Sequence, residues 1–129
     1  MILDTTVIID VLNKHPEAIA KLQELLEKNE PIIITTPSIF ELWSGVAQSK
    51  KPEEEKQKIK QVLQHQIIWD LDEPAAEKAG LIDGTLISQG KQIQPEDAMI
   101  AGIALTNKDD VLTRNVKDFA KAGVKVQTY

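Results

Sequence analysis

The chain is predicted to fold as an α/β domain with a mostly parallel central sheet of about five strands, flanked by helices on both faces. Short runs of β-branched and aliphatic residues alternate with longer segments in which apolar residues recur at helical spacing. Strands separated by helices pair in parallel, because each crossover lays a helix on one face of the sheet. A chain of 129 residues has the usual size of one domain, and no linker or internal repeat divides it. One domain spanning residues 1–129 is therefore expected.

Five segments have the composition of buried strands. The first surrounds Ile2–Leu3 at the start of the chain. The others are Ile32–Thr35, Ile67–Leu71, Val111–Thr113 and Val124–Gln127.

The intervening segments are predicted helices. One is expected to begin at Thr6, directly after the first strand, and another to follow Asn115. Five further helices are predicted at Pro16–Asn29, Pro37–Gln48, Pro52–Gln64, Glu73–Gln89 and Pro95–Thr106. A proline stands at or next to the start of each of these five, where a missing backbone N–H costs little.

The composition restricts the class of protein. With 42% hydrophobic and 27% charged residues, it is that of an ordinary globular protein. No apolar run approaches the roughly 20 residues of a membrane span, and no signal peptide is recognisable. The absence of cysteine excludes disulfides and thiolate metal sites and fits a cytoplasmic location. The net charge of −5 argues against non-specific nucleic-acid binding, but not against a nuclease, since metal-binding carboxylates themselves add negative charge.

Asp4 is the only charged residue in the apolar run from Ile2 to Ile9. A buried carboxylate costs several kcal/mol unless it is paired, hydrogen-bonded or bound to a cation. No lysine or arginine lies nearby in the sequence. A cation ligand is one interpretation of Asp4, and a helix N-cap after the strand is the other.

Glu41 and Asp97 are the other acids of interest. Glu41 is predicted to lie opposite the apolar stripe of its helix, beside Ser38 and Gly45, whose small side chains leave room for a substrate. An exposed glutamate is the alternative. Asp97 is predicted to face the packed side of its helix at the first turn, where capping is the alternative. Glu96 is expected to face solvent.

A polar cluster follows the predicted strand at Val111–Thr113. Thr113, Asn115 and Asp118 offer hydroxyl, amide and carboxylate oxygens. In doubly wound sheets, ligands bind at the carboxyl ends of the strands, where these residues are predicted to lie. Alternatively, Asn115 caps the last helix and Asp118 completes a capping box.

Oxygen-only donors select a hard cation such as Mg²⁺ or Mn²⁺. The two histidines, His15 and His65, lie outside the candidate segments, so zinc chemistry is not expected. Without a cation, clustered carboxylates repel one another, and at least one should take up a proton. With a cation, they can orient an acidified water for in-line attack on a phosphodiester.

Four segments together resemble the PIN-domain ribonucleases, specifically the VapC-type toxins of toxin–antitoxin pairs. They are "ILDTTVIID", "SIFELWSG", "EDAMIAGIAL" and "VLTRNVKDF", and they occur in the order found in that family. The resemblance implies a single PIN-like domain in which Asp4, Glu41 and Asp97 bind metal and Thr6 supports Asp4. Asn115 stands where many PIN domains carry a fourth acid. Either Asn115 or Asp118 supplies that position, and one or two metal ions remain possible.

The resemblance also implies a function. Similar proteins are Mg²⁺-dependent endoribonucleases that cleave RNA, often transfer or ribosomal RNA, and leave a 3′-hydroxyl and a 5′-phosphate. They form homodimers and are inhibited by a VapB-type antitoxin. A catalytically weak module that binds RNA or protein is the alternative. Phosphatase chemistry with a nucleophilic Asp4 is set aside, because Thr6 stands where that class needs a second acid, and no phosphate-binding P-loop is present.

Overall fold

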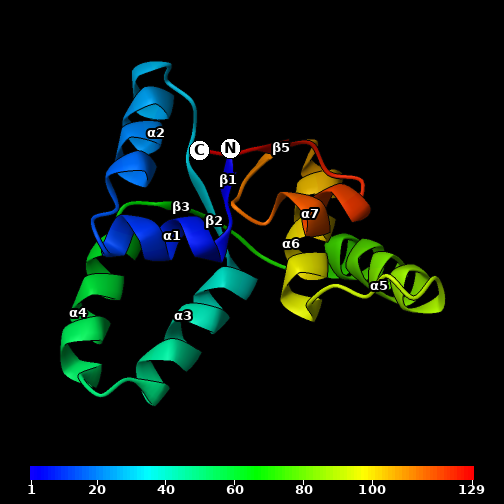
Figure 1. Cartoon of the computed structure of the whole chain (residues 1–129), viewed down its shortest axis with the longest axis horizontal. Coiled ribbons are helices and arrows are strands. Elements are labelled where there is room, and N and C mark those ends of the chain that lie inside the picture. Colours follow the sequence, from blue (N-terminus) through cyan, green and yellow to red (C-terminus); the bar gives the residue numbers. More distant parts are fainter.

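Five strands and seven helices alternate along the computed structural model, which describes all 129 residues (Figure 1). The strands are β1 (Ile2–Leu3), β2 (Ile33–Thr35), β3 (Ile67–Trp69), β4 (Val111–Leu112) and β5 (Val126–Gln127). The helices are α1 (Thr5–Leu12), α2 (Pro16–Glu27), α3 (Thr36–Gln48), α4 (Pro52–Leu63), α5 (Glu73–Ser88), α6 (Pro95–Asn107) and α7 (Val116–Lys121). Every predicted strand and helix is confirmed. None of the helices combines the length and apolarity that crossing a bilayer requires.

The strands form one sheet in the order β3-β2-β1-β4-β5, and every pairing is parallel. The predicted α/β class is therefore confirmed. Because the strands are parallel, their carboxyl ends share one edge of the sheet. Asp4 follows β1, Thr35 ends β2, and Thr113 follows β4 at this edge. In Figure 1 it is the lower edge, from which α1 and α3 begin.

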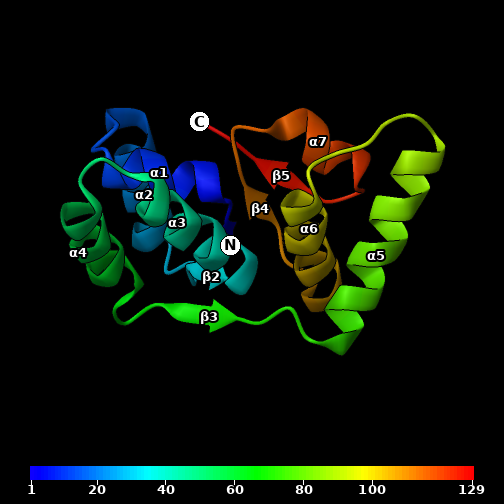
Figure 2. The same cartoon turned by 90° about the horizontal axis from the view of Figure 1, so that it is seen from below.

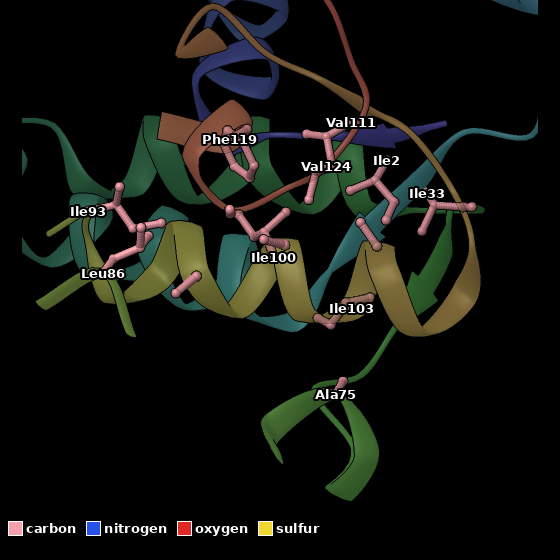
Figure 3. Packing of buried hydrophobic residues seen from close by; sticks show 14 residues of the cluster. Ile2, Ile33, Ala75, Leu86, Ile93, Ile100, Ile103, Val111, Phe119 and Val124 are labelled. Carbon is pink, nitrogen blue, oxygen red and sulfur yellow. The ribbon is translucent and has the colours of Figure 1, made fainter. Parts of the chain in front are cut away.

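Successive strand residues face opposite sides of the sheet and build two separate cores. On one side, Ile2, Ile33 and Val111 pack with residues of α5, α6 and α7, which Figure 3 shows from close by. On the other side, Leu3 and Leu112 pack with residues of α1 to α4. Figure 2 shows the resulting separation into α1–α4 and α5–α7. The prediction of helices on both faces is confirmed.

Helices α5 and α6 approach each other closely at Gly102. A Cβ built there would lie 2.5 Å from the carbonyl oxygen of Ala75 and 2.8 Å from the Cβ of Ala79. Only glycine permits this separation of the two backbones. The contact fixes α6, whose first turn carries Asp97, against α5.

Candidate active site

Asp4 lies at the centre of a hydrogen-bonded cluster at the carboxyl edge of the sheet. Its side chain is only 2% exposed. One carboxylate oxygen accepts a bond from the backbone N–H of Thr5 at 2.7 Å, as an N-cap of α1 does. The other accepts from the hydroxyls of Thr6 at 2.9 Å and Thr113 at 2.8 Å. Asp4 therefore caps α1 and also joins β1 to the end of β4. The N-cap interpretation is confirmed, and the cation ligand stays a prediction.

Glu41 reaches the same cluster from α3. The Thr5 hydroxyl donates to Glu41 Oε1 at 2.7 Å and lies 2.9 Å from the hydroxyl of the fully buried Ser38. Glu41 is half-buried, so the alternative of an exposed glutamate is wrong. Gly45, one turn further along, has no atom within 4 Å of its would-be Cβ and leaves open space beside the acid.

Asp97 enters the cluster from the first turn of α6. The Asn115 amide donates to Asp97 Oδ2 at 3.0 Å and to Asp118 Oδ2 at 2.9 Å, so it bridges two carboxylates. The Asn115 side chain does not cap α7, and the carboxylate of Asp97 accepts no backbone N–H. Asn115 still occupies the N-cap position of α7 and Asp97 the first turn of α6, so the alternatives hold for position but not for a capping hydrogen bond from the side chain.

One continuous network joins all the predicted site residues. The backbone N–H of Asn115 donates to the Thr113 hydroxyl at 2.8 Å, which connects the Asp4 group to the Asp97 group. The network contains Asp4, Thr5, Thr6, Ser38, Glu41, Asp97, Thr113, Asn115 and Asp118. Asp4, Glu41 and Asp97 form no ion pair. The only basic partner of Asp118 is Lys121, whose Nζ lies 3.6 Å from Asp118 Oδ1. A local excess of negative charge results.

Burial, together with this excess of charge, shifts the pKa values of two acids upward. Burial, followed by the charges of Asp4, Glu41 and Asp118, raises the pKa of Asp97 from 3.8 to about 7, although the Asn115 hydrogen bond opposes the shift. Burial also raises the pKa of Glu41, with smaller contributions from Asp4 and Glu96, against the hydrogen bond from Thr5. Both shifts favour the protonated acid, in the direction of the predicted uptake of a proton.

The raised pKa of Asp97 predicts that the metal-free protein loses stability as the pH rises. In the unfolded chain this group titrates near 3.8, and in the folded protein near 7, so the folded state binds more protons between these values. Its free energy of unfolding should fall across that interval, by at most about 4 kcal/mol. Urea unfolding with EDTA, on either side of the interval, measures the effect. Asp97→Asn should remove most of it, and an unchanged pH dependence in that variant would refute this assignment.

The residues match a hard divalent cation in chemistry and charge. They offer carboxylate oxygens without imidazole, thiolate or a competing basic group. No three His, Cys, Asp or Glu side chains are arranged around one point as metal ligands. The hydroxyls of Thr5, Thr6 and Thr113 and the amide of Asn115 satisfy the carboxylate oxygens instead.

Three participants are absent from the sequence-based prediction. Thr5 and Ser38 connect Asp4 to Glu41, yet the sequence cannot distinguish Thr5 from Thr6 as the partner of an acid on another helix. Glu96 is partly exposed, and its charge acts on Glu41, a contribution that the expectation of a solvent-facing residue does not include. Its position beside Asp97 in the first turn of α6 is the only signal in the sequence.

Comparison with known proteins identifies the family of the chain. The family model described as the PIN domain matches residues 1–125. Ribonuclease VapC2 of Rickettsia felis is 32% identical over 119 residues, which are 92% of this chain and 89% of the relative. The tRNA(fMet)-specific endonuclease VapC of Shigella flexneri is 30% identical over 122 residues, covering 94% and 90%.

Solved structures give the same result. The structure of VapBC2 from Rickettsia felis bound to a DNA fragment from their promoter matches with a TM-score of 0.86 and 28% identity, covering 98% of this chain and 96% of that one. DNA-bound VapBC from Salmonella typhimurium matches with a TM-score of 0.87 and 26% identity at the same coverage. The chain belongs to the PIN-domain family and, within it, to the VapC group.

Proposed function

We propose that this protein is a divalent-metal-dependent endoribonuclease and the toxin of a VapBC-type pair. The observation that carries the proposal is the convergence of Asp4, Glu41 and Asp97 in one network without a basic partner. The relatives named ribonuclease and tRNA(fMet)-specific endonuclease support RNA as the substrate, with transfer RNA ahead of ribosomal RNA.

In this proposal, Asp4 and Asp97 hold Mg²⁺, or Mn²⁺ as a substitute, and Glu41 is the third ligand. The bound cation supplies Lewis acidity toward the phosphodiester and lowers the pKa of a water molecule. Thr6 and Thr113 fix the orientation of the Asp4 carboxylate. Glu41 accepts a hydrogen bond at only one of its oxygens, which leaves the other to orient the attacking water.

Asn115 and Asp118 share the fourth position of the site. Asn115 supplies the amide that holds Asp97 in place, and Asp118 supplies the charge. An acid at position 115 would face two carboxylates at hydrogen-bonding distance, so the amide lowers repulsion where Asp118 is present.

The proposed partners follow from the relatives. Structures of VapBC complexes support a VapB-type antitoxin as the protein partner of this chain. We also propose that the chain forms a homodimer, which light scattering of the purified protein tests directly.

A titration with Mn²⁺ or Mg²⁺ tests the proposed chemistry. Either ion is expected to raise the melting temperature, because it binds the folded site and neutralises its charge. It should also start cleavage of a total RNA pool into fragments with 3′-hydroxyl and 5′-phosphate ends, which end sequencing detects. Thermal stabilisation without cleavage would contradict the ribonuclease and favour the binding module, which Asn115 at the fourth position and the net charge of −5 keep in consideration. Stabilisation of Asp97→Asn to the same extent would contradict the metal site.

A further inference from the structure

A hollow of about 310 Å³ lies between the first turns of α3 and α6. It is lined by Thr36, Pro37, Phe40, Leu71, Glu96 and Met99. Phe40 is 64% exposed, although it is one of only two phenylalanines in the chain and the other is fully buried. An exposed aromatic ring forfeits the free energy that its burial would contribute, so its exposure needs a reason.

The hollow adjoins the candidate active site. Phe40 precedes Glu41 on α3, and Glu96 precedes Asp97 on α6, so each helix contributes one residue to the site and a neighbour to the hollow. The charge of Glu96 acts on Glu41. Figure 1 shows the first turns of α3 and α6 facing each other below the sheet. The hollow is therefore within reach of a nucleotide adjacent to a phosphodiester bound at the acids.

The hollow is also rigid at its base. The hydroxyl of Thr36 accepts a hydrogen bond from the backbone N–H of Leu71 at 3.1 Å, which ties the segment after β3 to the start of α3. Leu71 and Met99 also line the hollow, and Pro37 restricts the backbone next to Thr36. A preformed surface of this kind loses little conformational entropy when it binds a flat group.

The lining favours a nucleobase over the sugar–phosphate backbone. Aromatic, thioether and proline side chains present apolar surface to a flat ring, and single-stranded RNA is recognised largely by such stacking. Glu96 is the only charged residue of the hollow, and its carboxylate repels a phosphate. The same carboxylate accepts hydrogen bonds from exocyclic amino groups, as acidic side chains do with cytosine N4. Uracil has no such group.

We propose that this hollow receives the unpaired nucleobase next to the cleaved phosphodiester, with Phe40 stacking on the base and Glu96 selecting bases that carry an amino group. The inference rests on the proposed ribonuclease function and assigns a specificity subsite to it. It predicts that the flanking position is occupied by cytosine, adenine or guanine in preference to uracil.

Binding of short labelled homopolymers of cytosine, adenine and uracil, measured by fluorescence anisotropy with Ca²⁺ in place of Mg²⁺, tests the stacking residue. Phe40→Ala should weaken binding of the cytosine and adenine oligomers about tenfold, the order expected for one lost stacking contact. Phe40→Trp should retain the wild-type affinity. Leu81→Ala is the matched control, because Leu81 is also 64% exposed but lies on α5 outside the hollow. Equal affinity of Phe40→Ala and wild type, or no RNA binding by either, would overturn the subsite.

Glu96→Gln tests the selection. The amide can donate as well as accept, so the preference for amino-bearing bases should disappear while the affinity for the uracil oligomer is retained or increased. If the wild type binds all three oligomers equally well, Glu96 does not select bases that carry an amino group. A change of molecular mass of Phe40→Ala in light scattering, with loss of RNA binding, would assign the hollow to a second copy of the chain instead.

The subsite and the ribonuclease fail in different ways. If the wild type cleaves RNA but its binding is independent of base and of Phe40, only the subsite is wrong. If the wild type shows the predicted pattern of binding but no divalent ion induces cleavage, the hollow binds a nucleobase, but the ribonuclease and the hollow's role in cleavage are wrong.

Discussion

Asp97→Asn is expected to abolish metal-dependent RNA cleavage while leaving the fold intact. The substitution keeps the size of the side chain and an oxygen that can accept the Asn115 hydrogen bond, but it removes the charge that holds a cation. The loss of rate should be at least about 10²- to 10³-fold, the effect of removing one group that stabilises developing charge. Asp4→Asn should have the same effect, because Asp4 lies at the centre of the network. Initial rates on a defined RNA with saturating Mg²⁺ measure both.

Asp70→Asn is the matched control, since Asp70 is an exposed acid outside the network. It should cleave RNA at the wild-type rate. Circular dichroism should show folded protein for all three variants, and Asp97→Asn should be more stable than the wild type above pH 7 without metal, because a buried charge is gone. Full activity of Asp97→Asn, in a preparation free of contaminating nuclease, would refute the assignment of Asp97.

Gly102→Ala is expected to destabilise the fold more than other single-methyl additions. The new Cβ would lie 2.5 Å from a backbone oxygen of Ala75, which cannot rotate away as a side chain can. The clash has to be relieved by separating α5 from α6, so the free energy of unfolding should drop by about 2–3 kcal/mol, near the upper end for an overpacked core. Urea unfolding at equilibrium measures the change. Because α6 carries Asp97, cleavage by the variant should also decrease.

Gly84→Ala provides the control for this clash. Gly84 lies on α5 with nothing within 4 Å of its would-be Cβ. Alanine there should stabilise the protein by about 0.5–1 kcal/mol through helix propensity alone. If Gly102→Ala proves as stable as Gly84→Ala, the close contact of the two helices is not as described.

Much of the fold could be predicted because local patterns and tertiary structure agree. Proline near five of the seven helix starts and β-branched strand runs locate most elements, and the single charge in the first apolar run identifies Asp4. The candidate acids could be found for a similar reason: Asp4 follows a strand directly, Asp97 lies in the first turn of a helix, and Glu41 lies opposite the apolar stripe of its helix. These are local signals that require no knowledge of distant contacts.

The contacts between the acids could not be predicted, because they join distant parts of the chain. The bond from Thr113 to Asp4 spans 109 positions, and that from Thr5 to Glu41 spans 36. Helical periodicity places Glu41 opposite the apolar stripe but does not reveal that α1 covers that side. The exposure of Phe40 could not be predicted either, because a phenylalanine one turn from Thr36 is expected to be buried in the core. Glu96 faces the hollow only because α3 lies across from α6.

Diffraction from crystals grown with Mn²⁺, measured at the manganese absorption edge, tests the central claim most directly. The predicted result is an anomalous peak within coordination distance of carboxylate oxygens of Asp4 and Asp97, with Glu41 facing the same ion, and no such peak in Asp97→Asn. Manganese bound elsewhere on the molecule, with these three carboxylates still held only by threonine and asparagine donors in an enzyme that cleaves RNA, would contradict it.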